Sequence, residues 1–334
     1  MDKKFVYADN AATTRVSQRV LDAMLPYYRE HYGNPSALYS IAAQSKEAVD
    51  KARAQVAAAI HAEPDEIYFV SCGTEADNWA IKGAARANRD KGAHFISTPF
   101  EHHAVLHSLD TLVKESGAEV TYLPVYDNGI VKVEDLAAAI RPDTVLVTVM
   151  FANNEIGTVQ PIAELGALCR ARGVLFHTDA VQAVGHLAID VKAQNIDMLS
   201  MSGHKFHGPK GCGVLYIRRG VKLPNFMDGG GQEKKRRAGT ENVAQIVGIG
   251  EAIETACGKL ESEAKRLSAM RDRLMDGILA KIPNSRVNGD RTHRLPGNVN
   301  VSIEFVEGES MLMLLNMNGI CAASGSACTS GSLT

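Results

Sequence analysis

Residues 196–211 read IDMLSMSGHKFHGPKG, and the interpretation of the fold starts from this stretch. Ile196 to Met201 is an apolar run typical of a buried strand, so we expect Lys205 just past the carboxyl end of that strand. Ligands bind at this edge in open α/β sheets. A lysine amine that is partly desolvated there is a candidate nucleophile for imine formation. The competing interpretation is a surface lysine in a turn rich in glycine and proline.

Strand-like and helix-like runs alternate on both sides of this stretch. The strand-like runs are residues 67–70, 94–97, 120–125, 145–151, 174–177, 198–201 and 213–218. Helical patterns cover residues 75–89, 104–116, 134–140 and 162–172. This alternation predicts an α/β fold with a mostly parallel sheet that carries helices on both faces.

A smaller unit is expected after the sheet. Residues 219–240 form a loop-rich break, and one long helical pattern, expected to act as a connector, follows over residues 242–281. A strand-like segment at 299–305 and a helix-like segment at 309–318 then suggest a small α+β domain. We therefore predict a large domain over residues 15–255 and a small domain formed by residues 1–14 and 256–334.

The composition excludes some classes of partner. The chain has 334 residues, of which 45% are apolar, and its 36 basic and 38 acidic residues leave a net charge of −2. This balance gives no electrostatic reason to expect nucleic acid. No apolar run reaches the roughly 20 residues that a membrane span needs, and the first residues do not resemble a signal peptide. We expect a cytoplasmic protein.

Six cysteines occur without the CxxC spacing of zinc sites, so neither a zinc site nor a disulfide framework is indicated. Five of them (Cys72, Cys169, Cys212, Cys257 and Cys321) lie in or beside apolar stretches and are most simply core residues. Cys328 differs because it lies in a tail of small residues, where core packing cannot explain it. A mobile loop would let its thiolate move into a site and out again. An incidental cysteine in a disordered end is the alternative.

A carboxylate could share the edge with Lys205. Asp179 follows the strand-like run 174–177 and precedes Lys205 by 26 residues. Pyridoxal phosphate needs a lysine for its imine and a carboxylate that keeps its pyridine nitrogen protonated. A helix N-cap is the alternative role of Asp179.

Three further segments could line the same crevice. In the turn 71–75, Gly73 and Thr74 could offer amides and a hydroxyl to a phosphate, although Thr74 could equally be an N-cap. In the segment 101–103, a histidine could stack on a cofactor ring, bind a metal or lie on the surface. In the segment 153–157, the amide side chains could bind a ring substituent or the substrate, or only close an Asx turn.

Taken together, the motifs resemble the cysteine desulfurases of the NifS/IscS type, a group of class-V aminotransferases. The matching segments run in order over nearly the whole chain. They are Asp9-Asn10-Ala11-Ala12-Thr13-Thr14, Tyr32-Gly33-Asn34-Pro35-Ser36, Gly73-Thr74-Glu75-Ala76-Asp77-Asn78, Glu101-His102, Asn153-Asn154-Glu155-Ile156-Gly157, His177-Thr178-Asp179-Ala180-Val181-Gln182, Ser202-Gly203-His204-Lys205, Gly239-Thr240 and Ser324-Gly325-Ser326-Ala327-Cys328.

The resemblance implies a homodimeric transferase of fold-type I with a seven-stranded type of sheet and pyridoxal 5′-phosphate as cofactor. Such enzymes convert L-cysteine to L-alanine and keep the sulfur as a persulfide. The implied catalytic residues are Lys205 as the Schiff-base lysine, Cys328 as the persulfide carrier and His102, rather than His103, as the ring-stacking base.

The resemblance also implies the binding residues. Asp179 would hold the pyridine nitrogen, Gln182 the phenolic oxygen, and Asn154 would lie near that oxygen and the substrate. Asn34 would contact the substrate carboxylate. The phosphate would be held by Gly73, Thr74, Ser202 and His204, with Thr240 reaching it from the other subunit.

As partner, the resemblance implies an iron–sulfur scaffold protein (IscU/NifU-like) that accepts the sulfur. It implies no intrinsic metal, although Cys328 could be a transient iron–sulfur ligand with that scaffold. In this family an arginine beyond the cysteine loop contacts the substrate carboxylate, and the sequence to Thr334 offers no such arginine. We therefore expect a form that ends there to bind cysteine poorly.

Other activities remain compatible with parts of the pattern. Lys205 and Asp179 alone would also permit a selenocysteine lyase, another fold-type I lyase or an aminotransferase. Cys328 argues against the aminotransferase. A non-catalytic partner subunit in sulfur transfer is a third possibility, and the intact lysine, aspartate and cysteine argue against it.

Overall fold

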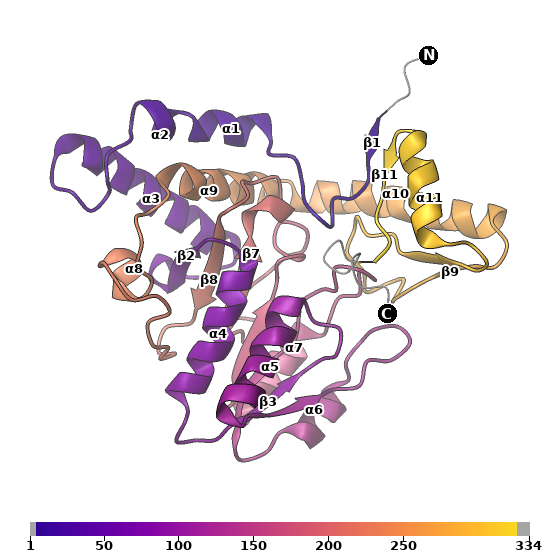
Figure 1. Ribbon diagram of the computed structural model, residues 1–334, viewed down its shortest axis with the longest axis horizontal. Coiled ribbons are helices and arrows are strands. Elements are labelled where there is room, and N and C mark those ends of the chain that lie inside the picture. The colour runs from indigo at the N-terminus through magenta and orange to yellow at the C-terminus, as the bar shows by residue number, and fades with distance from the viewer. Residues whose placement is uncertain (1–4, 326–334) are drawn as a thin grey trace.

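A computed structural model describes residues 5–325 and has an α/β fold, as predicted. Its centre is a seven-stranded sheet in the order β2-β8-β7-β6-β5-β3-β4. Only β8 runs antiparallel to its neighbours β7 and β2, and all other pairs are parallel. Helices flank this sheet, and a smaller unit lies at the end of a long helix (Figure 1).

The predicted elements agree with the observed ones to within a few residues. The central strands are β2 (Ile67–Val70), β3 (His94–Ser97), β4 (Glu119–Tyr122), β5 (Thr144–Thr148), β6 (Leu175–Asp179), β7 (Met198–Ser202) and β8 (Gly213–Ile217). The helices around them are α1 (Gln18–Met24), α2 (Pro26–Arg29), α3 (Ser40–Ala59), α4 (Gly73–Ala87), α5 (His103–Ser116), α6 (Val133–Ala139), α7 (Ile162–Ala171), α8 (Gln232–Lys235) and α9 (Val243–Cys257), with the 3₁₀ turns η1 (Pro64–Glu66) and η2 (Gly203–Lys205).

The sheet separates two apolar cores, which explains why its strands are apolar on both faces. On one face, α4 and α5 bury Trp79, Ile81 and Leu109 against the strands. On the other face, α1, α3, α7 and α9 form a larger core that includes Val56 and Ile249. With both faces covered, ligands can reach the sheet only at the ends of its strands.

The prediction of one long connecting helix over residues 242–281 was wrong. The chain forms two helices, α9 and α10 (Leu260–Lys281), with a break at Gly258 and Lys259. Their burial explains the difference. Most apolar side chains of α9 are buried in the core beside α3, whereas α10 buries only Met275 among the described residues. Only the second helix therefore connects the sheet to the smaller unit (Figure 1).

Segments from both ends of the chain form the smaller unit. Strand β1 (Val6–Tyr7) pairs in parallel with β11 (Ile320–Cys321), and β9 (Ser285–Val287) pairs antiparallel with β10 (Val301–Ile303). Helix α11 (Gly308–Met317) lies beside β11 (Figure 1). The predicted domain boundaries at residues 15 and 255 stay a prediction. None of the helices within residues 5–325 is long and apolar enough to span a membrane.

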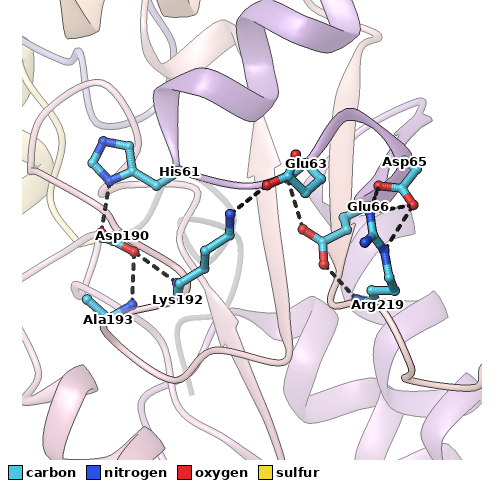
Figure 2. A network of polar contacts seen from close by, with 8 residues as sticks. All are labelled: His61, Glu63, Asp65, Glu66, Asp190, Lys192, Ala193 and Arg219. Carbon is cyan, nitrogen blue, oxygen red and sulfur yellow. Dashed lines mark hydrogen bonds and ion pairs between the residues drawn. The ribbon is translucent and has the colours of Figure 1, made fainter.

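A polar network on the large unit fixes the turn that leads into β2 (Figure 2). Glu63 and Glu66 cap η1 reciprocally. The backbone amide of Arg219, just after β8, donates a half-buried hydrogen bond to the carboxylate of Glu66 (2.7 Å) and holds the chain there. The surrounding ion pairs, such as Lys192 to Glu63 (2.7 Å), are exposed. Exposed pairs of this kind contribute little stability, so the buried part of Glu66 is the more important anchor.

Candidate active site

A cavity of ≈ 290 Å³ opens at the carboxyl edge of the sheet, where β2, β6 and β7 end. This is the edge at which the sequence predicted the site. Nine of the predicted residues line the cavity. They are Gly73, Thr74, His102, Asn154, Asp179, Gln182, Ser202, His204 and Lys205.

Lys205 lies on the 3₁₀ turn that directly follows β7, as expected from the apolar run before it. Its ammonium group donates to the carbonyl oxygens of Ala11 (2.5 Å) and Ala12 (2.9 Å). Thr14 fixes the same turn, because its amide and hydroxyl both donate to the carbonyl of His204 (2.9 and 2.8 Å). The surface-lysine interpretation is therefore wrong, and the N-terminal segment is part of the site.

Asp179 is the last residue of β6 and is only 5% exposed. One carboxyl oxygen accepts from the amide of Val181 (2.9 Å), so the side chain closes a local turn rather than capping a helix. Burial raises the pKa of Asp179, and the neighbouring His102 and Lys205 act against that shift. A buried carboxyl group in this position is suited to meet a cationic group in the cavity.

His102 is the N-cap of α5, and its Nδ1 accepts from the amide of Ala104 (3.1 Å). Burial lowers the pKa of His102, so the neutral ring is favoured. A neutral ring that accepts at Nδ1 carries its hydrogen on Nε2. His103 does not line this cavity, and its ring lies 4.9 Å from that of His107. Of the two adjacent histidines, only His102 can act in the cavity.

The start of α4 fits an anion. The N-cap position belongs to Cys72, which makes no side-chain capping bond, so the predicted N-cap alternative for Thr74 was wrong. The first amides of the helix therefore have no side-chain partner at the cap. A Cβ atom on Gly73 would lie 2.7 Å from Cγ2 of Val181 and 3.7 Å from Cβ of Ser202, so only glycine leaves this space open.

Burial also lowers the pKa of His204 to about 4, with Lys205 and Lys210 adding to the effect. Nδ1 of its neutral ring lies 3.0 Å from the hydroxyl of Thr13. His204 and Ser202 line the cavity beside the helix terminus. Together they place polar groups without net charge around the space that the helix amides face.

The two asparagines of the segment 153–157 have divided roles. Asn153 closes the Asx turn, because its Oδ1 accepts from the amides of Glu155 and Ile156 (both 2.9 Å). Asn154 lines the cavity instead. Gln182 also lines it and donates to the carbonyl of Ala11 (3.0 Å). The two alternatives considered for this segment therefore apply to different residues.

Two predicted residues of the described chain lie away from the cavity, and the position of a third is not described. Asn34 is exposed, and its Oδ1 accepts from the amide of Ser36 (3.0 Å). Thr240 is also exposed and lines a second hollow of ≈ 200 Å³ with Arg237 and Glu241. Cys328 lies outside the described residues, although Gly325, three positions earlier, lines the main cavity.

Sequence reasoning assigned no role to several residues of the site. These are Asp9, Ala11, Ala12, Cys72, Asp77, Met150, Ala152 and Val181, which also line the cavity, and the buried Glu101 beside it. Most of them belong to the motifs of the resemblance, which was the available signal. The core prediction holds for Cys169 and Cys212, and Cys257 is half-buried against the larger core. It is wrong for Cys72, which is half-buried at the cavity, and for Cys321, which is half-buried outside both cores.

The comparisons with known proteins agree with this geometry. The sequence model of the family described as Aminotransferase class-V matches residues 6–334. The cysteine desulfurase IscS of Methanosarcina thermophila is 57% identical over 99% of this chain and 82% of its own length. The protein of the same name from Clostridium botulinum is 56% identical over 99% of this chain and 83% of its own length.

Solved structures show the same relationship. One named NifS-like protein superposes with a TM-score of 0.93 at 38% identity, covering 96% of this chain and 88% of that one. A second, described as SspA in complex with cysteine, has a TM-score of 0.85 at 36% identity and covers 98% of this chain and 92% of its own. In both comparisons the TM-score and the sequence identity are higher than a shared fold alone requires.

The chain belongs to the class-V aminotransferase family, whose members are fold-type I enzymes that depend on pyridoxal 5′-phosphate. Within that family it is a cysteine desulfurase of the NifS/IscS type. The residues fit the cofactor. Lys205 offers an amine, Asp179 a buried carboxyl, and the uncapped start of α4 an anion site, all on one cavity.

Proposed function

We propose that this cavity binds pyridoxal phosphate and L-cysteine, removes the sulfur and releases L-alanine. The observation that carries the proposal is the convergence of Lys205, Asp179 and His102 on one cavity. When bound, the cofactor supplies an electron sink for bonds at the substrate's α-carbon. The protein's own residues must then orient the two molecules and move protons between them.

In this proposal each lining residue has one task. Lys205 holds the cofactor and moves a proton at the α-carbon, and the amide carbonyls of Ala11 and Ala12 orient its amine. Asp179 keeps the pyridine nitrogen protonated. His102, favoured in its neutral form, stacks on the ring and can accept a proton.

The phosphate is assigned to the start of α4, where a charge of two on the ligand meets amides without a side-chain cap. Gly73, Thr74, Ser202 and His204 surround that space. Gln182 and Asn154 are assigned to the phenolic oxygen and the substrate. These assignments rest on the resemblance together with the shared cavity.

Cys328 is proposed to receive the sulfur as a persulfide. Gly325 supports this, because it lines the cavity and three further residues can extend by about 10 Å. The thiolate attacks the sulfur of the substrate, the carbon–sulfur bond breaks, and its electron pair passes to the carbon side. The outer sulfur of the persulfide is then passed to an iron–sulfur scaffold protein of the IscU/NifU type.

The cytoplasmic location and the absence of an intrinsic metal stay predictions.

A homodimer is also part of the proposal, with Thr240 acting at the partner's cavity, and Asn34 stays assigned to the substrate carboxylate by the resemblance. Thr240 lies outside its own chain's cavity, and a set of large apolar side chains is exposed near the start of the chain. These are Tyr28, Tyr32, Leu38 and Tyr39. A second copy of the chain would cover them.

The test measures alanine and sulfide formation from L-cysteine by the purified holoenzyme. Cys328→Ala should keep the absorbance of the bound cofactor and lose sulfide formation. Cys321→Ala is the matched control, since this thiol does not line the cavity, and it should retain both. Sulfide formation by Cys328→Ala at the normal rate would exclude the proposed role.

The dimer has a separate test. Lys205→Ala and Thr240→Ala proteins should each be inactive or weak alone. If Thr240 serves the partner's cavity, mixing and refolding the two should restore about a quarter of the wild-type activity per total site, because half the dimers are mixed and each has one intact site. Absence of any restored activity in verified mixed dimers would refute the shared site.

A further inference from the structure

Asp77 is a second buried acid beside Asp179, and none of the roles above uses it. It lies one turn into α4, is 1% exposed and lines the cavity. Its Oδ1 has no hydrogen-bond partner among the described residues. One side-chain oxygen or nitrogen atom from each of Asp77, His102 and Asp179 lies within 4.8 Å of the other two. A carboxyl group in such a place needs an explanation.

Two carboxylates this close in a buried site cannot both be ionised at low cost, because each charge is poorly solvated and repels the other. One proton is therefore held between them over a wide pH range. The contacts of each residue indicate which one holds it.

Asp179 is the better carboxylate. It accepts from the amide of Val181, and the amine of Lys205, when charged, stabilises its charge. Within residues 5–325, no such cation faces Asp77. Its nearest imidazole, His177, is 3.7 Å away on β6, and burial lowers the pKa of His177 to about 3. That contact is therefore not an ion pair.

The other groups that face Asp77 also disfavour its charge. Burial raises the pKa of Asp77 well above its usual value, and the carboxyls of Asp179 and Glu101 and the thiol of Cys72 add to the effect. The hydroxyl of Ser200, from β7, acts in the opposite direction. Burial raises the pKa of Glu101 itself to about 8.

We propose that Asp77 is a positioning residue that stays protonated and neutral beside the Asp179 carboxylate. The pair then carries one negative charge, and that charge lies on the residue that meets the cofactor's ring nitrogen. Asp77 neither touches the substrate nor competes for the ring proton. This inference rests on the proposed function for its consequence, but the protonation of Asp77 is a property of the protein without cofactor.

The first experiment uses the apoprotein, so it stands even if the proposed function fails. The raised pKa makes the folded state hold a proton that the unfolded chain releases, so stability is lost as the pH rises above the unfolded pKa of about 4. Asp77→Asn is neutral at every pH and avoids that loss. Its melting temperature should gain on the wild type by about 2 °C per pH unit between pH 5 and 7. A difference that does not change with pH would overturn the inference.

The second experiment separates positioning from a purely structural role. Asparagine keeps a neutral polar group beside Asp179, whereas alanine does not. Asp77→Asn should bind pyridoxal phosphate within about twofold of the wild type, and Asp77→Ala about tenfold or more weakly, as expected when a polar group beside a buried charge is lost. Equal affinities for the two variants would refute the assignment.

A measurement on the native residue covers the case in which the variants do not fold. Infrared absorption of the apoprotein at pH 7, in the Glu101→Gln background, should contain the band of a buried protonated carboxyl. A spectrum without that band would show that Asp77 is ionised and the inference wrong.

Discussion

Replacing Arg294 by methionine should destabilise the protein and disturb the active-site turn that contains Asn154. Arg294 is 4% exposed, and burial lowers the pKa of its guanidinium to about 10, so it is still charged at neutral pH. It donates to the carbonyls of Asn298 (3.0 Å), Asn288 (2.8 Å) and Asp290 (3.0 Å) and to Oδ1 of Asn298 (2.9 Å).

The magnitude follows from these four bonds. Hydrogen bonds from a charged donor contribute about 1.5–3 kcal/mol each, or about 6–12 kcal/mol if they were additive. Burying the cation costs several kcal/mol, and bonds made by one group do not add. Methionine fills most of the space but leaves the acceptors unpaired. We expect a loss of about 4 kcal/mol in the free energy of unfolding.

The loss should reach the cavity because Asn298 also donates to the carbonyl of Glu155 (2.9 Å), next to Asn154. Urea unfolding of the apoprotein, followed by circular dichroism, measures the stability, and a titration with pyridoxal phosphate measures the site. Arg286→Met, on an exposed position of β9, is the matched control and should change stability by less than about 0.5 kcal/mol. A loss below about 1 kcal/mol for Arg294→Met would refute the reasoning.

Two further substitutions test the site by packing and by pH. Gly73→Ala places a Cβ atom 2.7 Å from Val181, so it should lower the free energy of unfolding by about 1–3 kcal/mol and weaken binding of pyridoxal phosphate. Gly277→Ala in α10, where nothing lies within 4 Å of the new Cβ atom, should raise the free energy of unfolding by about 0.5–1 kcal/mol. Equal urea midpoints for the two variants would contradict this. Burial raises the pKa of Glu101 to about 8. As the pH rises from the unfolded pKa to pH 8, the free energy of unfolding of the wild type should therefore fall by up to about 1.4 kcal/mol per pH unit. Glu101→Gln should remove the part of the pH dependence that is due to Glu101, and an unchanged pH profile of the urea midpoint would refute the assignment.

Local sequence patterns were sufficient for most of the fold and for the place of the site. Strand ends can be read from apolar runs, and parallel strands bring their carboxyl ends to one edge. That is why Lys205 after β7 and Asp179 at the end of β6 could be paired before their distance was known. The role of each residue at this edge came from the resemblance, because sequence spacing does not distinguish a phosphate ligand from a helix cap.

The features of the fold and site that could not be predicted depend on burial and on which residues contact one another in the folded chain. The break between α9 and α10 contains no proline, and its glycine, Gly258, is an ambiguous signal because a single glycine is also tolerated inside a helix. The packing of α9 against α3 decides which residues stay on the sheet. Asn153 and Asn154 are identical in type and adjacent, yet one closes a turn and the other lines the cavity. Only the course of the backbone separates them.

Burial also decides the charge of the site. Asp77, Glu101 and Asp179 count as three negative charges in the sequence, but burial raises the pKa of each of them. Of the three, Asp179 has Lys205 as a cationic neighbour that acts against the shift, and this favours the ionised form of Asp179. A cofactor with a protonated ring nitrogen would strengthen that preference. The distribution of charge in the site is therefore a property of the fold and its ligand rather than of the residue types.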